Sequence, residues 1–189
     1  MVRKLAYVNG GEIAEKRGDV NTLQNMLLRA AKQYPDKGII NIDAEGNEIF
    51  ISYQQLKEKA HEVLGGLQKH GVKKGDKAIL LCDSNEEYYY AIWGCFLGGI
   101  IPAPMTAPKN FSEKNNEIKA LISVWETMGK PVILSSDLLI KNISKHYYEL
   151  NFIDINNLLN AGVSGQIMEV EPEEVAVLNQ KVLCRLISI

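Results

Sequence analysis

The clearest pattern of hydrophobic and polar positions lies between Gly71 and Pro104. Lys77–Cys82 is a nearly continuous apolar run, which is typical of a strand buried on both faces. A helix from about Glu86 to Leu97 follows. It is apolar almost all round, so we expect other elements to cover it on several sides. Glycines end this helix, and Ile100-Ile101 begin a second strand that the prolines after them should break. The order strand, helix, strand predicts a parallel pair joined by a right-handed crossover.

Capping signals indicate where two helices begin. Ser84 precedes Glu87 by three residues, and Ser52 precedes Gln55 by the same spacing. In each pair the hydroxyl can accept a hydrogen bond from a backbone N–H, and the longer side chain can reach back to the start of the helix. Lys73-Lys74, before the strand, are expected to lie in a solvated turn. The helix after Ser52 has an apolar stripe formed by Tyr53, Leu56, Ala60, Val63, Leu64 and Leu67.

A leading helix and a β-hairpin precede this part of the chain. Residues 1–20 have only weak periodicity and are expected to form a loosely ordered arm. Asn21-Thr22 should open a helix that Pro35 ends. Gly38–Asp43 and Glu48–Ser52 then flank a tip that contains glycine, which predicts an N-terminal β-hairpin.

Helices and strands continue to alternate after Pro104, beyond a polar loop. The pattern predicts helices at Glu117–Met128 and from Asp137 to about Leu150, and strands at Val132–Ser135, Phe152–Ile155 and Val175–Leu178. Leu138 and Ile143 are expected to face inward from the second helix, and residues 156–174 are expected to be irregular. This alternation predicts an α/β fold whose mostly parallel sheet is flanked by helices.

Composition narrows the class of protein. The 189 residues suit a single domain, and a hydrophobic content of 46% is enough for a sizeable core. A net charge of −2, from 21 basic and 23 acidic residues, offers no electrostatic footprint for nucleic acid or an anionic membrane. Three cysteines form no C-x-x-C pair, and no apolar stretch suits a secretory leader or a membrane span. These features favour a soluble cytoplasmic protein.

Candidate catalytic groups are few, and we assign no catalytic, cofactor-binding or metal-ligating residue from the sequence. The chain contains neither G-x-x-x-x-G-K-[ST] nor G-x-G-x-x-G. His61 and His70 lie nine residues apart on one predicted helix, which is not the spacing of a helical metal pair. Cys82 and Cys95 are expected to fill the core. The aromatic residues at 88–96 could line an apolar pocket, but core packing is their expected role.

Four stretches stand in order along roughly residues 20–178: TLQNMLLRAAKQYPDK, ISYQQLKEKAHEVLGGLQKHGVKKGDKAILL, GCFLGGIIPAPM and EPEEVAVL. Together they resemble the N-terminal part of the adenylate-forming ligase superfamily. That superfamily includes acyl-CoA synthetases, fatty acyl-AMP ligases, luciferases and the adenylation domains of nonribosomal peptide and polyketide synthases. The third stretch is most similar to loading or adenylation domains of hybrid synthases and to fatty acyl-AMP ligases.

The resemblance implies an enzyme that uses ATP and Mg²⁺ to convert a carboxylate into an acyl-adenylate. The acyl group then passes to a thiol of coenzyme A or of an acyl or peptidyl carrier protein. Residues 21–178 would be an incomplete N-terminal α/β subdomain of the large domain of such an enzyme. In the family, the strand like VAVL leads into a Ser/Thr/Gly-rich loop that cradles phosphates. No residue after Leu178 matches that loop, and the family's later motifs are absent from the sequence.

Residues 179–189 depart from the family pattern. A frameshift, a premature stop or a cloning artefact would each produce such an ending, and we expect truncation rather than a purposeful short form. We therefore expect a fragment of an acid-activating ligase that is inactive alone. One alternative is a non-catalytic interaction module, or half of a split ligase, that docks on a partner synthase. Another is a small-molecule binder that uses the carboxyl ends of the strands.

Overall fold

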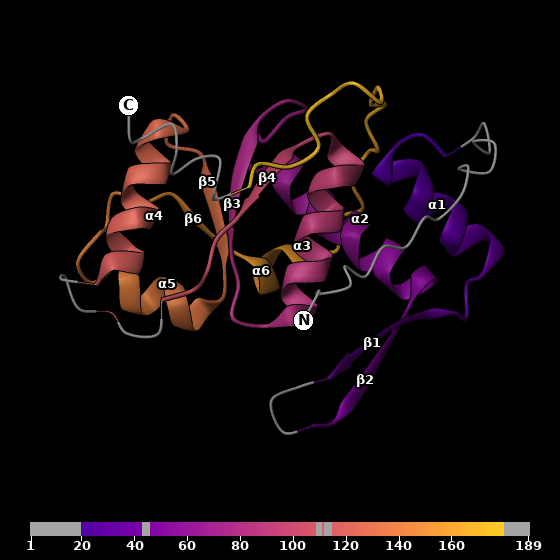
Figure 1. Ribbon diagram of the computed structural model, residues 1–189, viewed down its shortest axis with the longest axis horizontal. Coiled ribbons are helices and arrows are strands. Elements are labelled where there is room, and N and C mark those ends of the chain that lie inside the picture. The colour runs from indigo at the N-terminus through magenta and orange to yellow at the C-terminus, as the bar shows by residue number, and fades with distance from the viewer. Residues whose placement is uncertain (1–19, 43–45, 109–110, 112–114, 180–189) are drawn as a thin grey trace, which may run out of the picture.

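The structure is a computed structural model that describes residues 20–42, 46–108, 111 and 115–179. Four parallel strands form a sheet in the order β4-β3-β5-β6, and helices lie against both of its faces (Figure 1). The strands are β3 (Lys77–Leu81), β4 (Ile101–Pro104), β5 (Val132–Ser135) and β6 (Phe152–Asp154). The strands β1 (Gly38–Ile42) and β2 (Glu48–Ser52) pair separately as an antiparallel hairpin. The predicted α/β fold, with its mostly parallel sheet and N-terminal hairpin, is confirmed.

Six helices surround the sheet in the described ranges: α1 (Leu23–Gln33), α2 (Tyr53–Lys69), α3 (Asn85–Gly98), α4 (Asn116–Thr127), α5 (Asp137–Ile143) and α6 (Ile155–Leu159). None of these helices is long and apolar enough to cross a membrane. The expected arm at residues 1–20 and the expected tail at residues 179–189 lie outside the described residues, apart from positions 20 and 179.

Alternate residues of the sheet enter two hydrophobic cores, one on each face. Ala78 and Leu80 of β3 join the core that α2, α3 and α6 complete. Ile79 and Leu81 join the core that α4 and α5 complete. All four side chains are buried. The residues from Ala78 to Leu81 are all apolar because each successive side chain enters one of the two cores.

Backbone capping agrees with the predicted helix starts. The N–H of Gln55 donates to Ser52 Oγ at 3.1 Å, and the N–H of Glu87 donates to Ser84 Oγ at 3.4 Å. The expected return contact of Glu87 is different, because its Oε1 accepts from Asn156 Nδ2 of α6 at 2.9 Å. The Glu87 carboxylate thus links α3 to α6 instead of closing a capping box.

The prediction that prolines end β4 was wrong, because the strand continues through Pro102 to Pro104. The Ile101 N–H donates to Asp76 O, directly before β3, and the Met105 N–H donates to Leu80 O within β3. The two prolines at intervening positions therefore direct their nitrogens away from β3. Since β4 is at the edge of the four-stranded sheet, the prolines remove no hydrogen bond from it.

The prediction of a core strand at Val175–Leu178 was also wrong. The segment has no regular strand pairing, and Val175 and Val177 are 57% and 44% exposed. Its Leu178 N–H makes one hydrogen bond, of 2.9 Å, to Pro102 O on the outer side of β4. An apolar sequence becomes a core strand only where a sheet pairs with it along its length and a layer covers it. Of this segment, only Leu178 is half-buried, against the core that contains α4 and α5.

Helix boundaries differ from the prediction after β5. Helix α5 ends at Ile143 instead of about Leu150, and Leu138 is 63% exposed whereas Leu139 is buried. The short helix α6 lies where irregular structure was predicted. Seven residues make two turns of helix, too few to establish which of two adjacent leucines faces the core.

Candidate functional site

The connections of the sheet change direction at the carboxyl ends of β3 and β5. These strands are neighbours, but β3 continues into α3 on one face and β5 continues into α5 on the other face. Where the connections of adjacent parallel strands diverge in this way, ligands of α/β proteins commonly bind. Ser135 Oγ donates to Leu81 O at 2.7 Å and joins the two strand ends.

Acidic side chains surround this carboxyl edge. Asp83 follows β3, Asp154 ends β6, and Glu87 lies in the first turn of α3. Burial raises the pKa of Glu87, and the nearby charges of Asp83, Asp154 and Glu86 raise it further, while the hydrogen bond from Asn156 lowers it. Glu87 Oε2 is buried and has no hydrogen-bond partner in the part of the chain that the structure describes. Glu87 therefore binds a proton more readily than an exposed glutamate.

Cys82 is the thiol nearest to this edge in sequence. Burial raises its pKa to about 12, with further contributions from the charges of Glu87 and Asp83. Burial has the same effect on Cys95 inside α3, where the pKa is also about 12. A thiol with such a pKa is protonated at neutral pH and is a poor nucleophile. Both cysteines act as small core residues, in agreement with their expected role.

The residues at the carboxyl edge do not form a binding site for a nucleoside triphosphate or for its metal ion. Lys141 is near this edge, but its Nζ pairs with Asp137 at 2.6 Å. Ser136 Oγ is buried without a hydrogen-bond partner among the described residues, and a single hydroxyl cannot balance phosphate charge. No group of three or more His, Cys, Asp or Glu that could hold a metal occurs in the described ranges. We derive no catalytic step from these residues.

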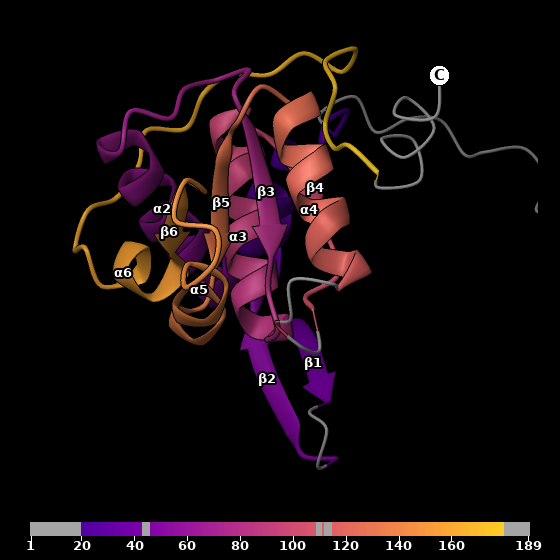
Figure 2. The same cartoon turned by 90° about the vertical axis from the view of Figure 1, so that its left-hand side faces the viewer.

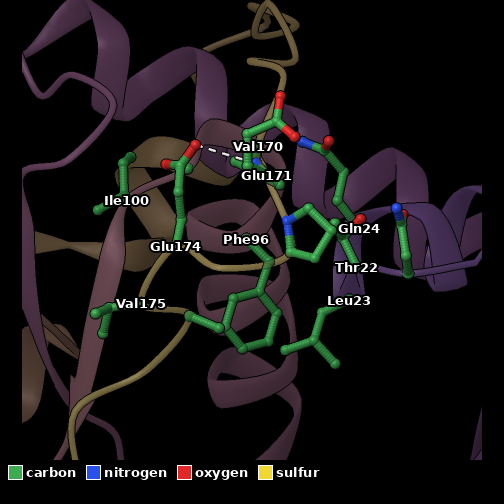
Figure 3. Close-up of a pocket in the computed structure, with 13 residues that line it drawn as sticks. Thr22, Leu23, Gln24, Phe96, Ile100, Val170, Glu171, Glu174 and Val175 are labelled. Atoms are coloured by element: carbon green, nitrogen blue, oxygen red, sulfur yellow. Dashed lines mark hydrogen bonds between the residues drawn. The ribbon is translucent and has the colours of Figure 1, made fainter.

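A concave pocket of about 160 Å³ lies at the opposite edge of the sheet (Figure 3). It opens between the first turn of α1, the end of α3 and residues 170–176. Leu23, Phe96 and Val175 supply apolar walls, and Glu171 and Glu174 lie on the side of residues 170–176. Its Ile100 directly precedes β4, so the pocket lies at the amino edge and away from the carboxyl ends of β3 and β5.

Specific hydrogen bonds hold the wall of this pocket in place. Lys74 Nζ contacts Glu174 Oε1 and Glu169 O, each at 2.7 Å, and the pairing with Lys74 lowers the pKa of Glu174. Lys74 is therefore not simply the solvated turn residue that was expected. Gln24 is buried, and its Nε2 donates to Leu97 O at 2.9 Å and to Met168 O at 2.7 Å. These polar groups are satisfied within the chain, and we regard the pocket as structural.

The other singled-out residues have contacts within the fold. His61 Nδ1 lies 3.3 Å from Gly165 O, and His70 Nδ1 lies 2.9 Å from Gly66 O. Tyr90 is buried and donates to Glu86 Oε1 at 2.8 Å. Phe96 packs edge-on against Trp93 and also lines the pocket. The buried role of Gln24 was missed, because a glutamine beside an apolar stripe gives no sequence signal for burial.

The fold and the carboxyl edge of its sheet define a doubly wound α/β subdomain. Among the described residues, this edge does not carry a complete set of groups for binding a nucleotide. A family model for AMP-binding enzymes matches residues 27–121, half of the chain. The chain belongs to this family, and the resemblance to the N-terminal part of adenylate-forming ligases is confirmed.

Solved structures and curated relatives agree with this assignment. The structure of McyG A-PCP complexed with phenylalanyl-adenylate is 36% identical, with a TM-score of 0.78, over 84% of this chain and 29% of that chain. The adenylation domain of a keto acid-selecting NRPS module, bound to keto acyl adenylate, is 29% identical with a TM-score of 0.77. The match covers 85% of this chain and 30% of that chain. Nonribosomal peptide synthetase sidE of Aspergillus fumigatus is 27% identical over 83% of this chain and 7% of its own length.

This chain spans less than a third of the two solved structures and less than a tenth of the first curated relatives, of which it covers 6% and 9%. The comparisons favour membership of the ligase family and do not favour the alternative of a non-catalytic interaction module.

Proposed function

We propose that residues 21–178 are the N-terminal section of a domain that activates carboxylic acids with ATP. In the proposed reaction a carboxylate oxygen of the acid attacks the α-phosphorus of ATP. The bond from that phosphorus to the bridging oxygen of pyrophosphate breaks, and acyl-adenylate and pyrophosphate form. The observation that carries the proposal is the 36% identity to McyG A-PCP, a protein solved with an acyl-adenylate, over 84% of this chain.

The acid and the acceptor are the finer parts of the proposal. The two solved relatives hold phenylalanyl-adenylate and a keto acyl adenylate, which supports an amino or keto acid as the substrate. The A-PCP relative and the nonribosomal peptide synthetase relative support a carrier protein as the acceptor, with coenzyme A as the alternative acceptor. The free thiols of Cys82 and Cys95 support a reducing compartment such as the cytoplasm.

The described section contributes a scaffold rather than reacting groups. Its carboxyl edge carries Asp83, Glu87 and Asp154, which repel phosphate, so the charge that binds ATP must come from another part of the domain. We therefore propose that the 189 residues alone do not form acyl-adenylate. The remainder of a ligase domain would supply the phosphate loop and the metal site.

ATP–pyrophosphate exchange tests this proposal. The assay uses the 189-residue chain and a chimera in which residues 23–178 replace the matched section of McyG A-PCP, each with a panel of amino and keto acids. We expect no exchange by the chain alone and acid-dependent exchange by the chimera. Exchange by the chain alone would contradict the scaffold role. A folded chimera that binds no acid and exchanges no pyrophosphate would contradict the ligase assignment of this section.

A further inference from the structure

Helix α6 depends on its contacts with the rest of the fold. Its five residues make little more than one turn, and so short a helix is not stable in water by itself. Of these residues, Ile155 and Leu158 are buried, in the core that α2 and α3 also form. Figure 2 shows α6 beside α2, on the side of the sheet away from α4. With two buried side chains, α6 can separate from the body at a lower cost in free energy than the sheet.

Two carboxylates hold the first turn of α6 through Asn156. The backbone N–H of Asn156 donates to Asp154 Oδ1 at 3.0 Å, and its Nδ2 donates to Glu87 Oε1 at 2.9 Å. Asp154 ends β6 directly before α6, so its contact is local. Glu87 belongs to α3 and lies 69 positions away in the sequence. We refer to the contact between Glu87 and Asn156 as the α6 link.

The α6 link contains a buried oxygen without a partner. Glu87 Oε2 is buried and accepts no hydrogen bond from the part of the chain that the structure describes. No basic side chain of the described ranges contributes to the charge around Glu87, and Lys141 pairs with Asp137. The titratable groups around this carboxyl come from the turn after β3, from α3 and from β6, and they are Cys82, Asp83, Glu86 and Asp154.

These surroundings favour the protonated form of Glu87. Burial raises its pKa, the Asn156 hydrogen bond lowers it, and the neighbouring carboxylates raise it. A protonated carboxyl group still has an oxygen that accepts from Asn156, so the α6 link forms without a buried charge. The ionised group keeps that bond but leaves a charged oxygen buried and unpaired, which costs free energy. Separation of α6 from α3 would let water reach Oε2 and would remove this cost.

We propose that the proton on Glu87 controls whether α6 stays on α3. The helix stays in place while Glu87 is protonated, and residues 155–161 open locally when the carboxyl group ionises. The closed state is therefore most stable in acid, and it loses stability as pH rises through the folded-state pKa of Glu87. The inference goes beyond the proposed function and does not depend on it, because α6 and the contacts used here lie within the described residues.

The segment after α6 has anchors of its own, so the opening should not spread along the chain. The Gly165 N–H donates to His61 O of α2 at 2.9 Å. The Met168 N–H donates to Leu97 O of α3 at 3.0 Å. Neither bond involves Glu87. The amides of Gly165 and Met168 are therefore internal controls for a local opening.

Amide hydrogen exchange followed by NMR tests this proposal in the 189-residue chain at about pH 4 and pH 8. The reporters are the N–H groups of Asn160 and Ala161, which donate within α6 to Asn156 O at 3.0 Å and to Leu158 O at 3.3 Å. Each rate is divided into that of an unstructured peptide at the same pH, which gives a protection factor. We expect the protection of both reporters to fall at least about fivefold between the two pH values, since one proton changes the opening equilibrium by up to about tenfold per pH unit.

Glu87→Gln is the decisive variant, because glutamine keeps an acceptor for Asn156 and carries no charge. We expect its reporters to have the same protection at both pH values. Asn156→Ala removes the α6 link, so its reporters should lose protection at both pH values. Glu126→Gln is the matched control, since Glu126 is exposed on α4, and it should retain the pH dependence of the original chain.

A pH dependence that persists in Glu87→Gln would overturn the proposal, and so would equal protection of the original chain at both pH values. Loss of protection at Gly165 and Met168 together with α6 would show a general loosening and would also overturn it. If Glu87→Gln does not fold, the carboxyl carbon of Glu87 can be titrated by NMR in the original chain. Its midpoint should coincide with the midpoint of the exchange change, and two separate midpoints would contradict the control by Glu87.

Discussion

Replacing Gly65 with alanine tests how closely residues 163–166 pack on α2. A Cβ at position 65 would collide with the carbonyl oxygen of Val163 and would lie 2.8 Å from the Gly165 nitrogen. Both neighbours are backbone atoms, so no change of rotamer relieves the contact. Gly65→Ala therefore requires the crossing segment to move away from the helix.

The expected loss in the free energy of unfolding follows from the hydrogen bonds that this movement would break. The Gly165 N–H donates to His61 O at 2.9 Å, and Gln68 exchanges two bonds with the backbone of Gln166, at 2.7 and 2.9 Å. Three bonds at about 1 kcal/mol each give a loss of about 3 kcal/mol. Alanine gains about 1 kcal/mol over glycine within a helix, which leaves a net destabilisation of about 2 kcal/mol.

Thermal unfolding followed by circular dichroism measures this effect. For a chain of this size, about 2 kcal/mol lowers Tm by about 4–8 °C. Gln55→Ala is the matched control, because Gln55 is exposed on the same helix, and we expect a change within about 0.5 kcal/mol. Helix propensity alone predicts that Gly65→Ala raises stability. A variant at least as stable as the original chain would therefore refute the close packing of this segment.

Three further predictions concern titratable groups. Glu87→Gln should raise Tm at about pH 8 and lose this advantage near pH 4, because burial raises the folded-state pKa of Glu87 and the original chain loses stability as pH rises through that value. Equal effects of Glu87→Gln on Tm at both pH values would contradict this prediction. Lys74→Ala should lower Tm more at about pH 7 than at pH 3, because the Lys74 contact lowers the pKa of Glu174 and its stabilisation is lost as Glu174 is protonated. An undiminished effect in acid would count against the pairing. Cys82 and Cys95 should resist alkylation at about pH 8 until urea unfolds the chain, because burial raises each pKa to about 12. Mass spectrometry of the peptides measures this, and rapid labelling of the folded chain would disprove it.

Local signals were sufficient for the parts of the fold whose partners are close in sequence. The hairpin was predicted because two strands flank a short tip, and β1 and β2 pair directly. The unit from β3 to β4 was predicted because its strands are apolar on both faces and its helix has a capping serine. In these cases the local pattern and the final packing favour the same structure.

Parts that depend on distant partners could not be predicted in this way. Val175–Leu178 has the sequence of a core strand, yet it makes one hydrogen bond to β4, and its residues are exposed apart from the half-buried Leu178. The burial of Gln24 depends on carbonyl groups of Leu97 and Met168, which are far from it in sequence. Glu87 similarly contacts Asn156, so the half-buried acid at the carboxyl edge has a partner that is far from it in sequence. The sequence showed the family, but it could not show which charges surround this edge.

Binding of MgATP tests the central claim most directly, because the account makes this section a scaffold without a site for the nucleotide. Isothermal titration calorimetry would compare the 189-residue chain with the McyG chimera, using the same nucleotide stock. The account predicts no saturable binding to the chain alone and saturable binding to the chimera. Saturable micromolar binding to the chain alone would contradict it, and so would a folded chimera that binds no MgATP.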